Sequence, residues 1–407
     1  MLLTVGSGEG KVRFFDKPGV RSVAASLVCI LGGILVGFLV MLLIAAGSTG
    51  CDPLLGLATL IGGPFSSGSW LYITTNLGDM IFYAAPLIMT GLSVAIAFKT
   101  GLFNIGAPGQ FLMGTAGSLT VALSIDSTGK SSGFWVWLLA IAVGMICGML
   151  WGAIPGLFKA LFGVNEVIVC IMTNWIAANL VSWFFSAKTS LINTGKGKAG
   201  YLITTASTGN GTPKLFLDRI FKGSYVDAGI VIAVIFAAVI YVIMNKTTFG
   251  YELKACGSNR NAAKYAGMNE KRNIVLSMAI AGMLAALGGA LYYLNPGIEF
   301  SYKSAYSSLP DYGFNGIPVA LLASNNPLGV IFSGIFLRYL SQGGDNLTSA
   351  GYNRYIADII IAIIIYFSGS SKLIRDFLVE RSKKRAKKVA SDCSNGENGC
   401  NGKGGVR

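Results

Sequence analysis

The stretch SVAASLVCILGGILVGFLVMLLIAA, residues 22–46, decides the class of fold to which this chain belongs. A helix needs roughly 20 apolar residues to cross a hydrocarbon layer of about 30 Å, and this stretch exceeds that length without a charged residue. The run is too long for a signal peptide, and no clean small-residue cleavage site follows it. Cationic residues precede it and place the N-terminus in the cytoplasm, namely Lys11, Arg13, Lys17 and Arg21.

The composition of the whole chain is that of a membrane protein. Its 407 residues have a mean hydropathy of +0.61, and 53% are hydrophobic while only 12% are charged. We expect an all-α, polytopic membrane protein of about ten spans, with interrupted helices in two related halves. The further candidate spans are Asp79–Phe98, Gly109–Ile125, Phe134–Phe158, Val164–Phe185, Ala228–Met244, Ile274–Leu294, Phe314–Ala323, Leu328–Leu340 and Tyr355–Ser368.

The charged ends enclose a transmembrane domain of residues 22–371. Residues 1–21 form a basic cytoplasmic arm, and residues 372–407 form a basic tail that becomes rich in Ser, Asn and Gly and is expected to be disordered. An even number of crossings returns this tail to the cytoplasm. The net charge of +14 therefore indicates orientation and contact with membrane lipid rather than nucleic-acid binding.

The side chains that commonly carry catalysis are scarce. The chain has no histidine, and its seven cysteines suggest neither a disulfide framework nor a metal site. The triplet Gly129-Lys130-Ser131 resembles the end of a phosphate-binding loop, but Ser124 stands where that pattern requires glycine. We therefore expect no cofactor on this chain and no enzymatic activity, and any ATP must be hydrolysed on another chain.

A basic segment between two apolar runs, residues 246–273, is expected to face the cytoplasm. It carries six cationic residues against two acidic ones. Ser258 is a predicted N-cap and Gly267 a predicted C-terminal stop of a short helix, with Ala262, Ala263 and Ala266 as its small apolar stripe. The helix is either a docking element for a soluble partner or an ordinary connector near anionic lipid headgroups.

Two membrane segments are broken by glycine and proline. They are KTGLFNIGAPGQ, Lys99–Gln110, and PDYGFNGIPVALLASNNP, Pro310–Pro327, which occupy corresponding places in the two halves. Such paired breaks are typical of a transport pathway, because unpaired backbone groups at membrane depth need protein or water beside them. The alternative is a pair of tight turns at the membrane surface. On the pathway interpretation the candidate lining residues are Phe103, Asn104, Gln110, Phe314 and Asn315, although the aromatic ones could equally pack.

The span that starts at Val164 carries a polar stripe at helical spacing. The stripe is Glu166, Cys170, Thr173, Asn174 and Ala177, with Trp175 beside it. Polar groups inside a bilayer face either a water-filled path or another helix to which they can hydrogen-bond. Both interpretations remain open for this stripe.

Four motifs in fixed order carry a family resemblance. They are GLFNIGAPGQ (101–110), NEVIVCIMTNWIA (165–177), ACGSNRNAAKYAG (255–267) and GFNGIPVALLASNNPLG (313–329). Together they resemble the permease subunit of bacterial ABC importers in the ribose and branched-chain amino acid permease superfamily, in the branch associated with nucleoside uptake. The resemblance covers roughly Met80 to Phe367. Each motif is modest alone, and the four in order are fairly specific.

The resemblance implies a subunit of a larger assembly in the bacterial plasma (inner) membrane. A second permease would pair with it, two cytoplasmic ATPase subunits would use ATP, and an external lipoprotein would deliver a small polar solute, with nucleosides favoured. The coupling helix would comprise Ser258, Asn259, Arg260, Ala262, Ala263, Lys264 and Gly267. Pro108 stands where relatives usually carry an acidic residue, so a role of that carboxylate is in doubt here.

Other functions remain as alternatives. The substrate could be a sugar or a branched-chain amino acid. A self-sufficient secondary transporter would need an ion or proton relay inside the membrane. Glu166 and Asp358 are the candidate side chains for it, and two are few for a relay. A membrane-embedded enzyme lacks histidines, a metal cluster and paired carboxylates.

Charges at unusual places give two further expectations. Residues 186–226 should lie outside yet are basic, and Lys188, Lys196 and Lys198 could meet acidic patches on a delivering protein or could simply be solvated. Arg338 and Asp358 lie within the last candidate spans, where an unpaired charge is costly. We expect the two to pair, unless each extends to the interface.

Overall fold

The computed structural model describes residues 18–47, 50–66, 68–129, 132–195, 197–304, 307–353 and 355–369. These residues form helices and connecting loops, with no strand among them beyond two isolated β-bridges. The basic arm up to residue 17, the tail beyond residue 369, Lys130, Ser131 and Lys196 lie outside the described residues. The expectation of an all-α protein is confirmed for the described part.

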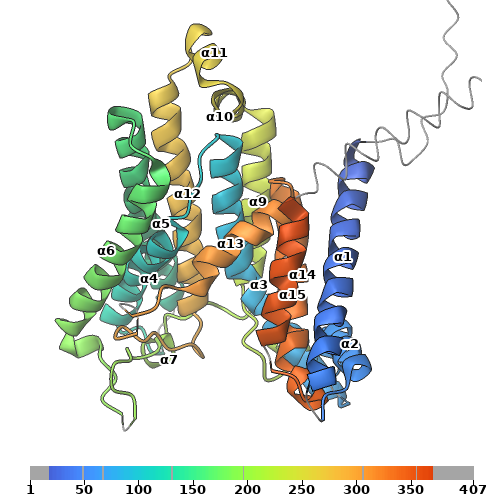
Figure 1. The fold of residues 1–407 in the computed structure, drawn as a ribbon. Helices are drawn as coiled ribbons and strands as arrows, with labels where there is room; N and C mark the ends of the chain where they lie inside the picture. Colours follow the sequence, from blue (N-terminus) through green and yellow to red (C-terminus); the bar gives the residue numbers. More distant parts are fainter. Residues whose placement is uncertain are drawn as a thin grey trace, which may run out of the picture.

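Figure 1 shows the arrangement of these helices. The longer ones are α1 (Pro18–Gly47), α2 (Pro53–Gly62), α3 (Trp70–Lys99), α4 (Ala107–Ser124), α5 (Gly133–Phe162), α6 (Glu166–Ser186), α9 (Gly229–Lys246), α10 (Thr248–Ser258), α12 (Glu270–Tyr293), α13 (Asp311–Leu322), α14 (Pro327–Asp345) and α15 (Tyr355–Gly369). The short ones are η2 (Gly63–Ser66), η3 (Thr189–Leu191), α7 (Thr205–Thr208), α8 (Leu217–Ile220), α11 (Arg260–Tyr265) and η4 (Leu347–Ala350).

The number of full membrane spans is smaller than expected. Among the described residues, six helices are long and apolar enough to cross a membrane, namely α1, α3, α5, α6, α9 and α12. Helices α13 and α14 would add a seventh only as one broken span, because they meet at an angle of 119°. Helix α15 has 15 residues, which at 1.5 Å per residue falls short of the hydrocarbon thickness. Ten spans and two related halves are therefore not confirmed.

Helix α12 forms the centre of the bundle and packs tightly on α5. Glycines of α5 face small residues of α12, so that a Cβ added at Gly152 would lie 2.8 Å from the Cα of Gly282. A Cβ added at Gly156 would lie 3.0 Å from the Cα of Val275. Small residues at such a contact let helices approach closely within a membrane, where van der Waals packing drives their association. These two helices provide a rigid support for the neighbouring α3 and α4.

Helix α1 lies at the periphery, against α15 (Figure 1). Only 17% of its most apolar window is buried. Its contact is built from glycine against isoleucine, because Gly33 faces Ile364 and Gly37 faces Ile360. Residue numbers rise along α1 from the first pair to the second and fall along α15, so the two helices are antiparallel.

The two ends of the bundle differ in their loops (Figure 1). Helices α10 and α11 lie at one end, where α1 also begins and α15 ends. The segment of residues 186–226, which contains α7 and α8, lies at the opposite end. The basic segment 246–273 and the segment 186–226 are therefore on different sides of the bundle, as the candidate spans require.

Candidate functional site

Two helices begin inside the bundle and meet at their N-terminal ends. After α3 ends at Lys99, the chain runs without helix through Leu102–Asn104 before α4 begins at Ala107. Helix α13 begins at Asp311, and its Gly313 lies so close to Pro108 of α4 that an added Cβ would overlap the Pro108 backbone. The two segments in which breaks were predicted, Lys99–Gln110 and Pro310–Pro327, therefore contact each other.

A pocket of about 430 Å³ lies beside this junction. That volume is within the usual range for small-molecule sites. Helix α6 contributes Trp175 and α13 contributes Phe314, whose side chains are 45% and 37% exposed. The remaining lining residues are Ile105, Ile171, Asn174, Ser307, Ser308, Leu309 and Asp311. The pocket thus combines two accessible aromatic rings with a carboxylate, two hydroxyls and an amide.

Asn174 joins the polar stripe of α6 to the start of α4. Its Oδ1 accepts a hydrogen bond of 2.9 Å from the Gly109 N–H, and its Nδ2 donates one of 2.9 Å to the Ile105 carbonyl. The residue is only 2% exposed. Its amide therefore holds two backbone groups that the broken helix leaves unpaired, and it lines the pocket as a positioning residue.

Asn104 and Gln110 form a buried pair of amides next to this junction. Asn104 Nδ2 donates to Gln110 Oε1 at 2.8 Å, and Gln110 Nε2 donates back to Asn104 Oδ1 at 3.0 Å. Asn104 Nδ2 also donates to Ser93 Oγ at 3.0 Å. Both side chains are buried and lie away from the pocket lining. They close the turn that starts α4, and the structure does not bring them to the pocket.

The other predicted lining residues take different positions. Phe103 stacks on Phe98 at 5.1 Å between ring centroids. Thr173 donates its hydroxyl to the Cys170 carbonyl of its own helix at 3.0 Å. Glu166 lies at the first turn of α6, where it pairs with Lys159 at 2.8 Å. Asn315 is exposed on α13 next to Phe314 but is not part of the pocket lining.

Three polar residues of the pocket are missing from the sequence prediction, besides the apolar Ile105, Ile171 and Leu309. Ser307, Ser308 and Asp311 precede or begin α13. Asp311 follows Pro310 directly, at the first position of a helix inside the bundle. A carboxylate in the first turn is favoured by the helix dipole. In the sequence, Asp311 therefore indicates the start of a helix rather than a binding residue. The signal that could have identified it is its place in the second broken segment.

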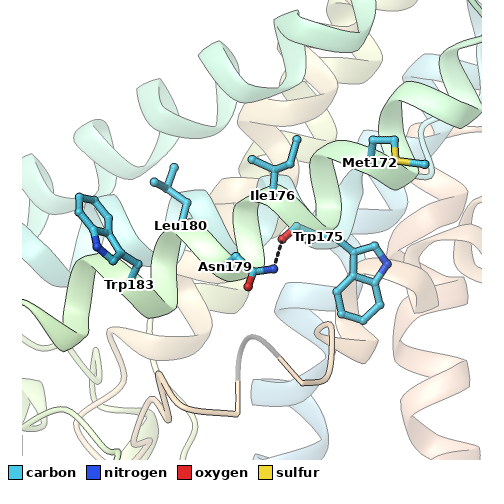
Figure 2. Close-up of a pocket in the computed structure, with 6 residues that line it drawn as sticks. All are labelled: Met172, Trp175, Ile176, Asn179, Leu180 and Trp183. Atoms are coloured by element: carbon cyan, nitrogen blue, oxygen red, sulfur yellow. Dashed lines mark hydrogen bonds between the residues drawn. The ribbon is translucent and has the colours of Figure 1, made fainter.

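A second groove runs along the outer face of α6 (Figure 2). Its volume is about 530 Å³, and its lining follows one face of the helix at spacings of three and four residues. The lining residues are Met172, Trp175, Ile176, Asn179, Leu180 and Trp183. Asn179 bonds to the Trp175 carbonyl at 2.9 Å, so the groove presents an apolar surface. Trp175 belongs to this groove and to the pocket at the junction.

The short helix predicted in the basic segment exists as α11, but its cap differs. Asn259 is the N-cap, because its Oδ1 accepts a hydrogen bond of 3.1 Å from the Ala262 N–H. Ser258 instead is the last residue of α10, a helix that was not predicted from the sequence. Gly267 has a φ of +80° and takes the predicted stop position. Ala263 is buried, whereas Ala262 and Ala266 are exposed, and Lys264 is exposed with them.

Helices α10 and α11 contact the broken segment that leads to α4. A Cβ at Gly257 would lie 2.8 Å from the Thr100 carbonyl carbon and 2.9 Å from the Gly101 nitrogen. Arg260 Nη2 donates to the Gly101 carbonyl at 3.3 Å. From α12, Ser277 Oγ donates to Thr100 Oγ1 at 2.8 Å. Helices α10 and α11 are therefore in direct contact with the segment that leads, a few residues later, to Ile105 in the pocket wall.

Arg338 takes its partners from its own helix rather than from Asp358. Its guanidinium lies 3.6 Å from the Asp345 carboxylate and donates to Gln342 Oε1 at 2.8 Å. It also lies over the Tyr83 ring, 4.5 Å from the centroid. Helix α14 continues to Asp345, beyond the predicted end at Leu340, and so places these partners one and two turns away on the same face. Asp358 is an exposed residue of α15.

Several charges of the segment 186–226 are engaged within the protein. Lys198 pairs with Glu299 at 2.6 Å, and Lys188 lies 5.9 Å from the centre of the Phe184 ring. Arg219 lies over Phe216 at 5.1 Å. These contacts account for part of the positive charge, and a role of this segment in docking stays a prediction.

Comparison with known proteins gives a consistent result. The sequence model of the family described as "Branched-chain amino acid transport system / permease component" matches residues 76–369. The guanosine ABC transporter permease protein NupP of Bacillus subtilis is 37% identical over 88% of this chain and 96% of its own length. The nucleoside ABC transporter permease protein NupB of Lactococcus lactis is 33% identical over 89% of this chain and 94% of its own length. No solved structure matches the chain.

More distant relatives come from the same two bacteria. NupQ of Bacillus subtilis, named as a guanosine permease protein, is 22% identical over 66% of this chain. NupC of Lactococcus lactis, named as a nucleoside ABC transporter permease protein, is 22% identical over 66% of this chain and 82% of its own length. Each bacterium therefore has two permease proteins of this kind, one close to this chain and one distant.

A glucose ABC transporter permease protein, TsgB13 of Haloferax volcanii, is 31% identical over 75% of this chain.

Proposed function

This chain belongs to the family of branched-chain amino acid transport system permease components, and we propose that it forms the nucleoside pathway of an ATP-driven importer. As a permease subunit it is a transport component and not an enzyme. The nucleoside assignment is supported by the relatives NupP and NupB, which match nearly the whole chain. ATP would be used on separate subunits.

The pocket at the junction of α4 and α13 is the observation that carries the proposal. A nucleoside needs a flat surface on which its base can stack and polar partners for its base edge and ribose. Trp175 and Phe314 offer exposed rings, while Asp311, Ser307 and Ser308 offer acceptors and hydroxyls in the same pocket. A ribose hydroxyl would donate to the Asp311 carboxylate, and the base would stack on an aromatic ring.

A second permease subunit would complete the pathway. The pairs NupP with NupQ and NupB with NupC support two permease proteins in such a transporter. The groove on α6 is a suitable contact because it is apolar, exposed and shares Trp175 with the pocket. A partner seated there would close the open side of the pocket and separate it from lipid.

The other partners would bind at the two ends of the bundle. Two ATPase subunits would contact α10 and α11 from the cytoplasm of a bacterium, and a lipoprotein would bring the nucleoside to the opposite end. Closure of the ATPases would push α10 against Gly101, and the Ile105 wall of the pocket would move with it. This route would link ATP hydrolysis to the opening of the pathway.

Uptake into vesicles tests the proposal. Trp175→Ala and Phe314→Ala should each weaken the apparent affinity for guanosine by about 5- to 150-fold, because stacking of one base contributes about 1–3 kcal/mol. Trp135→Ala and Phe162→Ala are matched controls, since both residues are exposed large aromatics outside the pocket. Glucose, leucine and guanosine are offered in competition. Preference for glucose or leucine, or uptake without ATPase subunits on an ion gradient alone, would contradict the proposal.

A further inference from the structure

A small polar pocket lies at the end of the bundle that carries α10, well separated in its residues from the pocket at the α4–α13 junction. Its volume is about 100 Å³. It lies between the ends of α3 and α9, helix α10 and the bend between α13 and α14. The lining residues that matter here are Lys99, Asn245, Lys254, Asn325, Asn326 and Pro327.

Two ammonium groups share this pocket without an acidic partner. Lys99 is the last residue of α3 and Lys254 belongs to α10. Among the described residues neither lysine forms an ion pair, and Lys254 has only a long hydrogen bond of 3.3 Å to Asn245 Oδ1. The nearby Glu252 is engaged by Asn273 at 3.0 Å. Two like charges facing so small a volume repel each other, and an anion between them would remove that repulsion.

The bend between α13 and α14 adds hydrogen-bonding groups to the same pocket. Helix α14 begins at Pro327, and Asn326 caps it by accepting a hydrogen bond of 3.1 Å from the Leu328 N–H. In the first turn of this helix of 19 residues Pro327 has no N–H, and Val330 N–H bonds to the Asn326 carbonyl, so the Gly329 N–H and the positive dipole end are left at this terminus. The buried Oδ1 of Asn325 has no hydrogen-bond partner. Rotation of this amide about χ2 presents its N–H₂ group in its place.

We propose that this pocket binds a phosphate group. Two lysines, a helix N-terminus and an adjustable amide provide cationic and N–H donors from several directions, which suits a compact anion with several oxygens. A volume of about 100 Å³ admits a phosphate group but not a nucleoside. The group comes either from soluble phosphate or from a lipid headgroup, because basic pockets between membrane helices also bind anionic lipids.

The position of the pocket gives its occupant an influence on the rest of the molecule. The phosphate group would connect α3, whose end leads through Gly101 towards α4, with α10 and with the bend after α13. Of these elements, α13 lines the junction pocket with Asp311 and Phe314, and α10 belongs to the basic segment 246–273. A bound phosphate group therefore holds the α13–α14 bend against α10, and its loss loosens that contact.

Thermal unfolding of the full chain in detergent tests the proposal. Inorganic phosphate is titrated at constant ionic strength, with chloride as the balancing anion. Wild type should be stabilised saturably, and Lys99→Gln with Lys254→Gln should weaken the apparent phosphate affinity at least tenfold. Lys246→Gln with Lys271→Gln is the matched control, because both lysines are exposed in the same basic region but do not line the pocket. Lys99→Arg with Lys254→Arg should retain binding.

Lipid as the source is tested by native mass spectrometry in the same preparations. Phosphatidylglycerol retained by wild type and by the control, but lost from Lys99→Gln with Lys254→Gln, would assign the site to a lipid phosphate. Saturable stabilisation by inorganic phosphate would assign it to the soluble ion. If the double variant does not fold, Lys254→Gln alone replaces it. Equal phosphate response and equal lipid retention in wild type and the glutamine variant would overturn the proposal.

Discussion

A methyl group at Gly257 should disturb the contact between α10 and the segment that leads to α4. In the Gly257→Ala variant the new Cβ would overlap the Lys99 carbonyl oxygen and would lie 2.8 Å from the Thr100 carbonyl carbon and 2.9 Å from the Gly101 nitrogen. All three neighbours are backbone atoms and cannot rotate away. The two segments must therefore separate by about 1 Å before ordinary van der Waals contact is restored.

The cost of this separation is about 1–3 kcal/mol, as for other overpacked sites. Part of it is offset in overall stability, because alanine is favoured over glycine in a helix by up to about 1 kcal/mol. The melting temperature should therefore change little, while the contact that couples α10 to Gly101 changes geometry. A bias of 1–3 kcal/mol against the coupled arrangement corresponds to about a 5- to 150-fold shift in its population.

The assay is the number of nucleosides transported per ATP hydrolysed, measured in vesicles that contain the assembled transporter. We expect this ratio to fall at least severalfold in Gly257→Ala while ATP hydrolysis continues. Gly47→Ala is the control, since a Cβ at Gly47 meets no atom within 4 Å. A normal ratio in a correctly folded Gly257→Ala variant would refute the role assigned to this contact.

Three further predictions follow from individual side chains. Asn174→Ala leaves the Gly109 N–H and the Ile105 carbonyl without their bonds, so the free energy of unfolding should fall by about 1–3 kcal/mol, and an unchanged denaturation curve would contradict this. Ala263→Glu places a charge at a side chain that is 3% exposed, and it should abolish coupling to ATP hydrolysis while membrane insertion continues, whereas wild-type coupling would count against docking at α11. Burial raises the pKa of Asp227 to about 7 from 3.8, against the opposing hydrogen bonds from Asn295 and Gly229. Because the folded state retains this proton where the unfolded state has lost it, stability should decrease as the pH rises from about 4 to 7, by up to about 4 kcal/mol. Asp227→Asn should remove this part of the pH dependence in thermal unfolding, and an identical pH profile would exclude Asp227 as its source.

Helical periodicity was sufficient to locate Trp175, one of the two aromatic rings of the pocket, but not the partners of the pocket's polar groups. The spacing from Glu166 to Ala177 places Asn174 on the inner face of α6, and Trp175 falls next to it at the pocket. The same spacing cannot show that the Asn174 amide is fully used by Gly109 and Ile105, because these groups belong to another helix. For the same reason the spacing cannot show that the Asn104 and Gln110 amides bond to each other and do not line this pocket.

Glycine and proline indicated the two breaks, but not how deep in the bundle they lie or that they meet. Contact between Gly313 and Pro108 joins residues that are far apart in the chain, and no local pattern encodes it. The cap of α11 was displaced by one residue, because Ser258 and Asn259 are both good N-caps and only the extent of α10 decides between them. Ten spans are not confirmed among the described residues, since α13 and α14 are arms of one bent pair and α15 has only 15 residues, which apolar stretches alone do not reveal.

The meeting of the α4 and α13 starts has an electrical consequence. Each helix start carries a partial positive charge, and the two lie side by side where the chain enters the bundle. Asp311 supplies one negative charge on the pocket side of the junction, where it can accept hydrogen bonds. Two helix starts of about half an elementary charge each and one carboxylate leave the junction with little net charge. Such a junction offers an ion no uncompensated opposite charge in exchange for its hydration shell, whereas an uncharged polar solute has little hydration energy to lose there.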